Sequence, residues 1–189
     1  MKKQIITIAG APGSGKSSTA KLVAQKLNFR HFSSGDFFRQ IGLKLGISLN
    51  QVSKIAETDT RIDKMTDEEI RKLANENQIV IDSRLAFHWI PDSFKVFLDL
   101  PLEIAKDRIA NDLKENLLRK SSEESSTKEE IYKKITDRLE SEKKRYKELY
   151  NIDHTDKNNF DLVIDTNKNN LFEVVQIIIS KYNEWIKDN

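Results

Sequence analysis

The feature that most constrains this chain is a glycine-rich stretch near its start, with the spacing G-x-x-x-x-G-K-S. It comprises Gly10, Ala11, Pro12, Gly13, Ser14, Gly15, Lys16 and Ser17. An apolar run at residues 5–9 precedes it and apolar residues at helical spacing follow it, so we expect strand, loop and helix in that order. Glycines let the backbone turn tightly and bring several N–H groups close to an anion. The spacing and its flanks therefore predict a phosphate-binding loop.

Residue types in and after this loop have separate tasks in the predicted phosphate site. The first turn of the following helix, which includes Ser18, offers free N–H groups and the positive end of a helix dipole. Lys16 supplies a positive charge for the outer phosphates, and the Ser17 hydroxyl is placed to ligate Mg²⁺. The alternative is a glycine-rich turn that carries a lysine by chance, and the full spacing argues against it.

Length and composition narrow the class of protein. The 189 residues predict one domain, and 32 basic against 30 acidic side chains give a net charge of +2, which does not support a nucleic-acid or membrane partner. The absence of cysteine excludes disulfides, thiolate metal sites and thiol nucleophiles. No apolar run has the length of a membrane span or the flanks of a signal peptide. We expect a monomeric enzyme of the cytoplasm.

Short β-branched runs alternate with helical patterns along the rest of the chain. We expect strands at residues 5–9, 28–33, 78–82, 95–99 and 160–166. Helical periodicity predicts helices after the loop, at 37–45, 48–58, from 60 to about 73, and at 102–112, 127–150 and 171–186. Residues 111–127 read as a mobile loop because few of them are apolar. The alternation predicts a three-layer α/β domain with a five-stranded parallel sheet.

Polar side chains at predicted strand ends are candidates for a second half of the site. Asp82 closes an apolar strand, where a carboxylate can hold the water shell of Mg²⁺ opposite Ser17. Arg39 and Arg84 follow strand ends, and their planar guanidinium groups suit a monophosphate. The alternatives are an exposed strand-end acid for Asp82 and surface salt bridges for the arginines. Asp36 could also hold the water shell of Mg²⁺, or it could only cap the helix that follows it. Capping is the favoured interpretation.

A phosphate loop alone does not separate a kinase from an ATPase, a GTPase or a motor. No N-K-x-D element follows the fourth predicted strand, which weakens the GTPase alternative, and the chain is short for a motor. Three scattered histidines, His31, His88 and His154, are unlike a metal cluster and are expected to be structural or exposed. Residues 87–89, Phe-His-Trp, suit either an aromatic base pocket or the core, and core packing is favoured.

With these residues placed, the chain resembles the nucleoside monophosphate kinases, and most closely the short cytidylate kinases of archaea and some bacteria. The likeness runs over nearly the whole chain, through residues 10–17, 32–39, 79–86, 96–103, 144–153 and 161–166. The first of these motifs is shared by a superfamily. The S-S-G-D-x-x-R and R-Y-K-x-x-Y-x-I-D segments are much narrower.

The resemblance implies a P-loop kinase fold that binds ATP and Mg²⁺ in the loop and CMP or dCMP on a helical insert. It divides the single domain into a core (1–34, 78–110 and 150–189), a helical acceptor-binding insert (35–77), and a mobile lid with its flanking helix (111–149). Lys16, Arg84 and Arg138 would be catalytic, with Arg145 as a further lid cation. The remaining implied contacts are Arg108 along ATP, and Ser34, Asp36, Arg39 and Arg84 at the acceptor.

Two departures from the family pattern bear on substrate choice and rate. Ser83 stands where relatives usually have glycine, which adds bulk near the acceptor. Asp112 and Thr136 stand where relatives often have arginine, so fewer cations would line the closed site. A kinase with another acceptor, such as AMP, UMP or a small metabolite, is the nearest alternative. A nucleotide-switched binding protein, with RNA on a basic helix face, is an alternative from another class.

Overall fold

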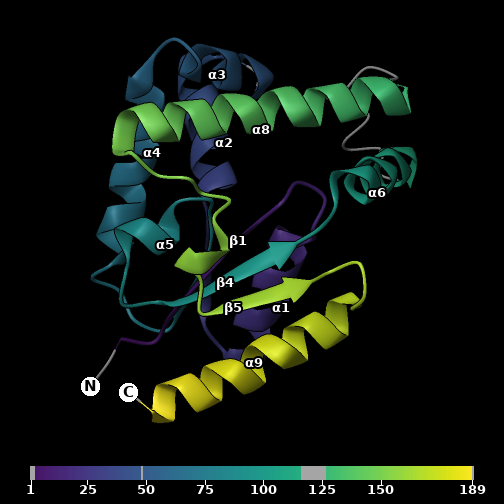
Figure 1. The fold of residues 1–189 in the computed structure, drawn as a ribbon. Helices are drawn as coiled ribbons and strands as arrows, with labels where there is room; N and C mark the ends of the chain where they lie inside the picture. The colour runs from purple at the N-terminus through teal and green to yellow at the C-terminus, as the bar shows by residue number, and fades with distance from the viewer. Residues whose placement is uncertain (1–2, 48, 116–126, 189) are drawn as a thin grey trace.

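A five-stranded parallel sheet forms the centre of the molecule in the computed structural model, which describes residues 3–47, 49–115 and 127–188. The strands are β1 (Ile5–Gly10), β2 (Arg30–Ser33), β3 (Ile79–Asp82), β4 (Phe94–Asp99) and β5 (Leu162–Asp165), in the spatial order β2-β3-β1-β4-β5. All the pairings are parallel (Figure 1). The predicted sheet is therefore confirmed, and only the strand ends differ.

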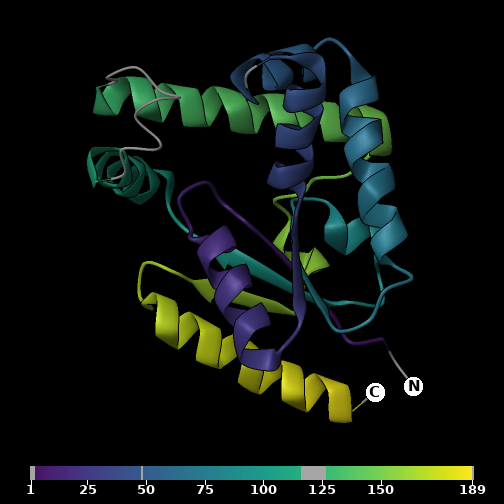
Figure 2. The ribbon, with the colours of Figure 1, turned by 180° about the vertical axis from the view of Figure 1, so that it is seen from behind.

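Helices cover both faces of the sheet. One face carries α1 (Lys16–Leu27) and α9 (Leu171–Lys187), which Figure 2 shows side by side. Ile6 and Ile8 of β1 point into this layer, whereas Ile5 points to the other face, toward α4 (Thr60–Leu73) and α5 (Ala86–Trp89). This alternation follows from the two-residue period of a strand. Because both faces are covered, the strands read as continuous apolar runs.

Three helices lie between β2 and β3, where the sequence predicted a helical segment. They are α2 (Ser34–Leu45), α3 (Leu49–Ala56) and α4, and they share a small core of Ile41, Val52, Ala56 and Ile62. Leu45 and Met65 follow the helical spacing of the apolar residues around them, yet they are 55% and 47% exposed. The shared core is too small to cover every apolar position of three helices. Ser48, the first residue of the helix predicted at 48–58, lies outside the described residues.

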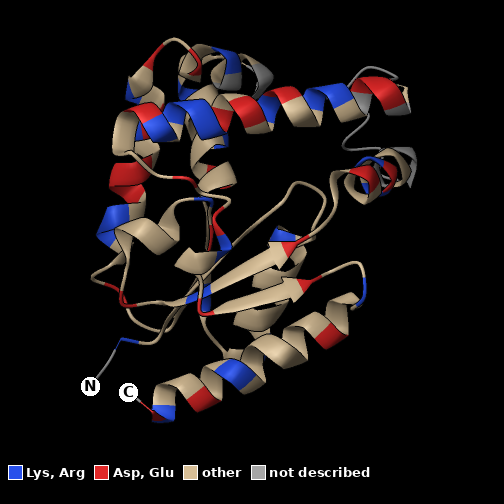
Figure 3. Cartoon of the chain, viewed as in Figure 1, with Lys and Arg blue, Asp and Glu red and all other residues tan. Residues whose placement is uncertain are grey.

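Two further helices cross the carboxyl edge of the sheet. The long helix α8 (Lys128–Tyr150) begins at a capping box formed by Thr127 and Glu130, and it packs against α6 (Leu102–Glu115). Figure 1 shows that α8 passes from α6 at one end to α4 at the other. Lysines, arginines and acids alternate along α8 (Figure 3). The mobile loop was predicted at residues 111–127, but residues 111–115 belong to α6, which ends at Glu115, and residues 116–126 lie outside the described residues.

Two short elements were not predicted. These are α5 and the 3-10 helix at Lys157–Asn159. The predicted strand at 28–33 begins only at Arg30, because Asn28 takes a left-handed conformation with φ 55° and ends α1. Among the described helices, none combines the length and the apolar content that crossing a membrane requires.

Candidate functional site

A cavity of about 870 Å³ opens at the carboxyl edge of the sheet. Its lining comes from the glycine-rich loop, the start of α2, the inner face of α4, the end of β3, and the facing sides of α6 and α8. The strand register explains the convergence, because Ser33 and Asp82 are paired across β2 and β3 and Ile8 is paired with Asp82 across β1. The predicted basic residues Lys16, Arg39, Arg84, Arg108 and Arg138 all line this one cavity.

The loop between β1 and α1 has the backbone geometry of an anion cradle. Gly10, Gly13 and Gly15 have φ angles of 149°, 70° and 82°, a region that other residues rarely adopt. Gly15 is the N-cap of α1 and supplies no side chain, so the first-turn N–H groups have no side-chain cap. The Ser14 hydroxyl is buried without a hydrogen-bond partner among the described residues. A free helix start and an orphaned hydroxyl both fit a bound phosphate.

Lys16 lies inside this cradle, at the first position of α1. Its Nζ donates to the carbonyl oxygen of Ala11 at 3.2 Å. Burial and the neighbouring Arg84 guanidinium lower the pKa of Lys16 to about 8, although Asp82 and Glu142 oppose this shift. The ammonium is therefore held in a place where it is costly without an anion.

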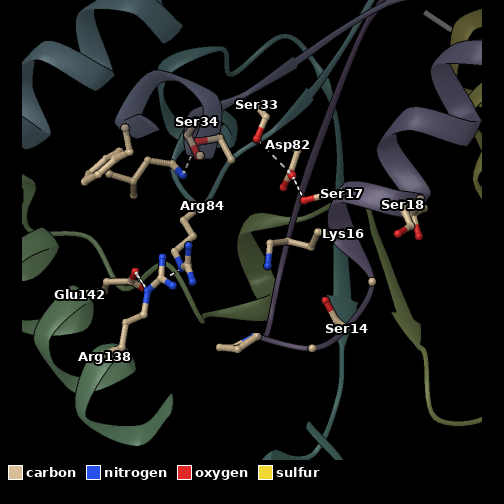
Figure 4. Close-up of a pocket in the computed structure, with 18 of the residues that line it drawn as sticks. Ser14, Lys16, Ser17, Ser18, Ser33, Ser34, Asp82, Arg84, Arg138 and Glu142 are labelled. Carbon is tan, nitrogen blue, oxygen red and sulfur yellow. Dashed lines mark hydrogen bonds and ion pairs between the residues drawn. The ribbon is translucent and has the colours of Figure 1, made fainter. Parts of the chain in front are cut away.

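Ser17 and Asp82 meet beside Lys16, as the sequence predicted. The Ser17 hydroxyl donates to Asp82 Oδ2 at 2.5 Å, and the Ser33 hydroxyl donates to the same oxygen at 3.4 Å (Figure 4). Asp82 is buried at the end of β3. A hydroxyl and a carboxylate are the hard oxygen ligands that Mg²⁺ prefers, so these residues fit the ion.

Arg84 and Arg138 converge on a single buried acid, Glu142. Arg84 Nε lies 2.6 Å from Glu142 Oε2, and Arg138 Nε donates to Glu142 Oε1 at 3.0 Å (Figure 4). The side chains of Arg84 and Glu142 are only 16% and 6% exposed. Burial alone would raise the pKa of Glu142, but the two guanidinium groups outweigh it and lower that pKa. This contact joins the end of β3 to α8.

Arg39 has its own acidic partner within α2. It forms an ion pair with Asp36, and both side chains are about half exposed. The helix begins at Ser34 with Ser33 as its N-cap, so the favoured interpretation of Asp36 as a cap was wrong. Asp36 also does not line the cavity, whereas Ser34 and Arg39 do. The carboxylate holds Arg39 and stands where a phosphate would compete for it.

The remaining predicted positions divide between the cavity and the scaffold. Ser18 and Arg108 line the cavity, and Arg108 also donates to the carbonyl oxygen of Thr166 at 2.6 Å. Ser83 is buried, and its Oγ accepts a hydrogen bond from the N–H of Leu85 at 3.3 Å. The Thr136 hydroxyl donates to the carbonyl oxygen of Tyr132, within α8. The side chain of Asp112 lies outside those described.

The histidines and the aromatic segment at residues 87–89 have structural or exposed positions outside the cavity lining. His154 is buried with its ring edge-on to Tyr146, at a centroid distance of 5.2 Å. His88 is exposed, and His31 lies on β2, partly buried. Phe87 packs against Phe160 in a buried cluster, so core packing was the better interpretation of that residue.

Three buried acidic residues of the cavity were missed from the sequence: Glu142, Asp63 and Asp67. A signal for Glu142 was present, since it stands three residues after Leu139 and four before Tyr146, on the inward stripe of α8. An acid at an inward position predicts a buried basic partner. Asp63 and Asp67 likewise lie on the buried face of α4, together with the apolar residues Ile62 and Ile70.

Comparisons with known proteins agree with this arrangement. The fold and the glycine-rich loop define a P-loop kinase. A shikimate kinase from Bacteroides thetaiotaomicron shares the fold with a TM-score of 0.63 at 12% identity, over 97% of this chain and 98% of its own. The family model described as the cytidylate kinase-like family matches residues 5–168. The chain belongs to that family and is a nucleotide kinase.

Relatives of known sequence include enzymes of similar length and one longer protein. A cytidylate kinase from Methanocaldococcus jannaschii is 37% identical over 181 residues, which cover 93% of this chain and 96% of that protein. An S-adenosylmethionine-dependent nucleotide dehydratase from Lacinutrix mariniflava is 35% identical over 95% of this chain, but the match covers only 36% of the dehydratase. A domain of this kind therefore also occurs within a larger protein.

Proposed function

We propose that this enzyme transfers the γ-phosphoryl group of ATP to the phosphate of CMP or dCMP, giving ADP and CDP or dCDP. The observation that carries the proposal is a single cavity in which a main-chain phosphate cradle faces Arg39 and Arg84. The names of the relatives, such as the cytidylate kinase of Methanocaldococcus jannaschii, support the choice of acceptor. Both nucleotides would lie within one chain, so we expect a monomer to be active.

On the donor side, the loop would bind the β- and γ-phosphates of ATP. The N–H groups of the loop and of the first turn of α1 would donate to phosphate oxygens, and Lys16 would add a positive charge. Ser17 and Asp82 would hold Mg²⁺, which neutralises charge on the phosphates when it is bound. Arg108, on α6, would lie along the ATP.

On the acceptor side, Arg39 and Arg84 would hold the monophosphate by paired hydrogen bonds. An oxygen of this phosphate forms the new bond to the γ-phosphorus, and the bond from the γ-phosphorus to the ADP oxygen breaks. A phosphate ester is largely ionised at neutral pH, because its second pKa is about 6, so the attack does not depend on a general base. The enzyme's task is therefore positioning and charge neutralisation.

Arg138 on α8 would bring a third guanidinium group to the transferring phosphoryl group. It lies next to Arg84 through Glu142, so the charge from α8 would lie beside the proposed acceptor site. The helices α6 and α8 with their connection would act as a lid, because closure excludes water that would otherwise take the phosphoryl group.

The test is ADP release from ATP and Mg²⁺ with a panel of CMP, dCMP, UMP, AMP and GMP. We expect CMP or dCMP to give the highest kcat/KM. Arg39→Ala and Arg84→Ala should each lower kcat/KM for the acceptor by roughly 100-fold or more, since charged and bidentate contacts are lost. Binding of a non-hydrolysable ATP analogue should persist in both variants.

The matched control is Arg30→Ala, because Arg30 is exposed and pairs with Glu76 outside the cavity. It should leave kcat/KM unchanged. A wild-type enzyme that no pyrimidine monophosphate stimulates would refute the proposal. Normal transfer by the Arg39 and Arg84 variants would refute the assigned acceptor site.

A further inference from the structure

Two carboxylates on α4 line the part of the cavity farthest from α6. Asp63 and Asp67 stand one helical turn apart, are only 2% and 6% exposed, and line the cavity together with Thr66 and Ile70. In Figure 1, α4 lies at the opposite end of α8 from α6. An acceptor whose phosphate meets Arg39 and Arg84 would therefore extend its base toward α4.

The two carboxylates differ in their partners. Asp63 is neutralised by Arg145 of α8, whose Nε donates to Asp63 Oδ2 at 2.8 Å. Asp67 accepts a hydrogen bond from the Tyr150 hydroxyl at 2.6 Å and forms no ion pair within the described part of the chain. Asp67 is thus a buried carboxylate on a cavity wall whose nearest hydrogen-bond donor is neutral.

A carboxylate in this position is costly to the folded protein. Burial raises the pKa of Asp67 to about 6, although the hydrogen bond from Tyr150 opposes the shift. A buried acid needs donors, and an ionised carboxylate can accept about four hydrogen bonds, of which Tyr150 supplies one and the indole N–H of Trp89 lies close enough to contribute another. The cavity side of Asp67 is left with acceptor capacity that a ligand N–H group can fill.

We infer that Asp67 reads the acceptor's base by accepting a hydrogen bond from the exocyclic amino group of cytosine. This inference rests on the proposed function, because it assigns the base end of the same acceptor site. Uracil carries an oxygen where cytosine carries the amino group, so it would set two acceptors against each other with no proton between them. A buried pair of unmatched acceptors is strongly unfavourable, and this selects the amino pyrimidine.

The test compares kcat/KM for CMP and UMP in the wild-type enzyme and in Asp67→Asn. The wild-type enzyme should prefer CMP. In Asp67→Asn the ratio of CMP to UMP should fall by roughly 10-fold or more, because the new amide group can donate to the uracil oxygen. The KM for ATP should not change. Glu68→Gln is the matched control, since Glu68 is the exposed acid next in the same helix, and it should leave the ratio unchanged.

A second arm uses the unaltered protein and so does not depend on folding of the variant. The acceptor is the monophosphate of the pyrimidin-2-one ribonucleoside, which lacks only the amino group of CMP. The wild-type enzyme should lose kcat/KM with this analogue, by a factor similar to the loss that Asp67→Asn shows with CMP. The variant should show little further loss with the analogue, since its amide oxygen accepts from Tyr150 and its N–H group, which faces the base, cannot accept the hydrogen bond of the amino group.

Several outcomes would overturn the inference while the kinase assignment stands. These are equal use of CMP and UMP by the wild-type enzyme, equal loss for all acceptors in Asp67→Asn, or full activity with the analogue. Failure of every monophosphate with the wild-type enzyme would instead refute the proposed function and remove the basis for this assignment.

Discussion

The donor and acceptor halves of the cavity differ in the chemical groups that line them. The donor half is mainly backbone, a loop whose shape is set by Gly10, Gly13 and Gly15 and whose N–H groups need no side chain. The acceptor half is made of arginine side chains, and each of them is held by a carboxylate of the protein. The pairs are Arg39 with Asp36, Arg84 and Arg138 with Glu142, and Arg145 with Asp63.

This difference indicates how each half would respond to a nucleotide. Backbone dipoles are fixed before binding, so the donor half requires little rearrangement to receive phosphates. An arginine that is already paired must exchange or share its carboxylate with the incoming phosphate. Placing those carboxylates beside the arginines lowers the cost of gathering several cations there when no phosphate is bound. The donor half should therefore depend on backbone shape, and the acceptor half on charge balance.

The largest effect should come from breaking the donor half at Gly10. Its φ of 149° is unfavourable for other residues, and an added Cβ would fall on the backbone carbonyl of Leu98. Gly10→Ala must displace β1 or β4, so we expect a loss of about 3 kcal/mol or more in the free energy of unfolding. Urea denaturation with CD detection measures this loss, and ATP binding should disappear with it.

Gly46→Ala is the matched control for this substitution. Gly46 also has a positive φ, 68°, but no atom lies within 4 Å of an added Cβ. It should lose only about 1 kcal/mol, from the backbone conformation alone. Equal losses in the two variants would show that the tight approach of Gly10 to β4 contributes nothing, and that the loop is less dependent on shape than we infer.

Breaking the acceptor half at Glu142 should have a smaller and more selective effect. Glu142→Gln keeps the size of the side chain but removes the charge that holds Arg84 and Arg138 together. We expect kcat to fall by roughly 10- to 100-fold, because misplaced guanidinium groups no longer meet the transferring phosphoryl group. Glu142→Asp should recover part of this loss, since its charge is retained.

Steady-state kinetics with both nucleotides varied separate this role from a purely structural one. The KM for ATP should stay within about twofold in Glu142→Gln, because the donor half is built from backbone. The control is Glu140→Gln, at an exposed position of the same helix. A parallel loss of ATP binding and of thermal stability in Glu142→Gln would show that the acid only supports the fold.

The same contrast explains what the sequence could reveal. The donor half lies within a short stretch, so its spacing alone predicted the loop, the lysine and the strand before it. Asp82 could be placed beside Ser17, because parallel strands end at one edge. The acidic partners of the acceptor half depend on long-range packing, since Arg145 and Asp63 are 82 residues apart. No local period shows which faces of α4 and α8 meet.

Exposure within the helical insert was hidden from the sequence for a related reason. Leu45 and Met65 follow the helical spacing of their apolar neighbours, but that spacing does not state how much core three short helices can share. Their common core is complete with four buried residues, and apolar positions beyond it lie at the surface. Helical spacing predicts which face of a helix is apolar. How much of that face is buried depends on the helices packed against it.

The smallest of these effects concerns the one titratable cation of the donor half. The pKa of Lys16 is lowered to about 8 by burial and by Arg84. At pH 7 the ammonium is mostly charged, and at pH 9 it is mostly neutral. Phosphate favours the charged form, so bound ATP should raise the pKa of Lys16. The enzyme should therefore take up a proton when ATP binds near pH 8. Affinity for an ATP analogue should change little near pH 7 and weaken by up to about tenfold per pH unit above 8.

Isothermal titration calorimetry in two buffers of different ionisation enthalpy measures both the affinity and the proton uptake. Lys16→Gln should bind the analogue more weakly but without this pH dependence, because the titrating group is gone. The arginines of the acceptor half remain charged across this range, so the pH dependence of the acceptor's KM should lack the step near pH 8. A step of equal size for both nucleotides would show that the two halves titrate as one network through Arg84 and Glu142, rather than as a backbone cradle and a separate set of ion pairs.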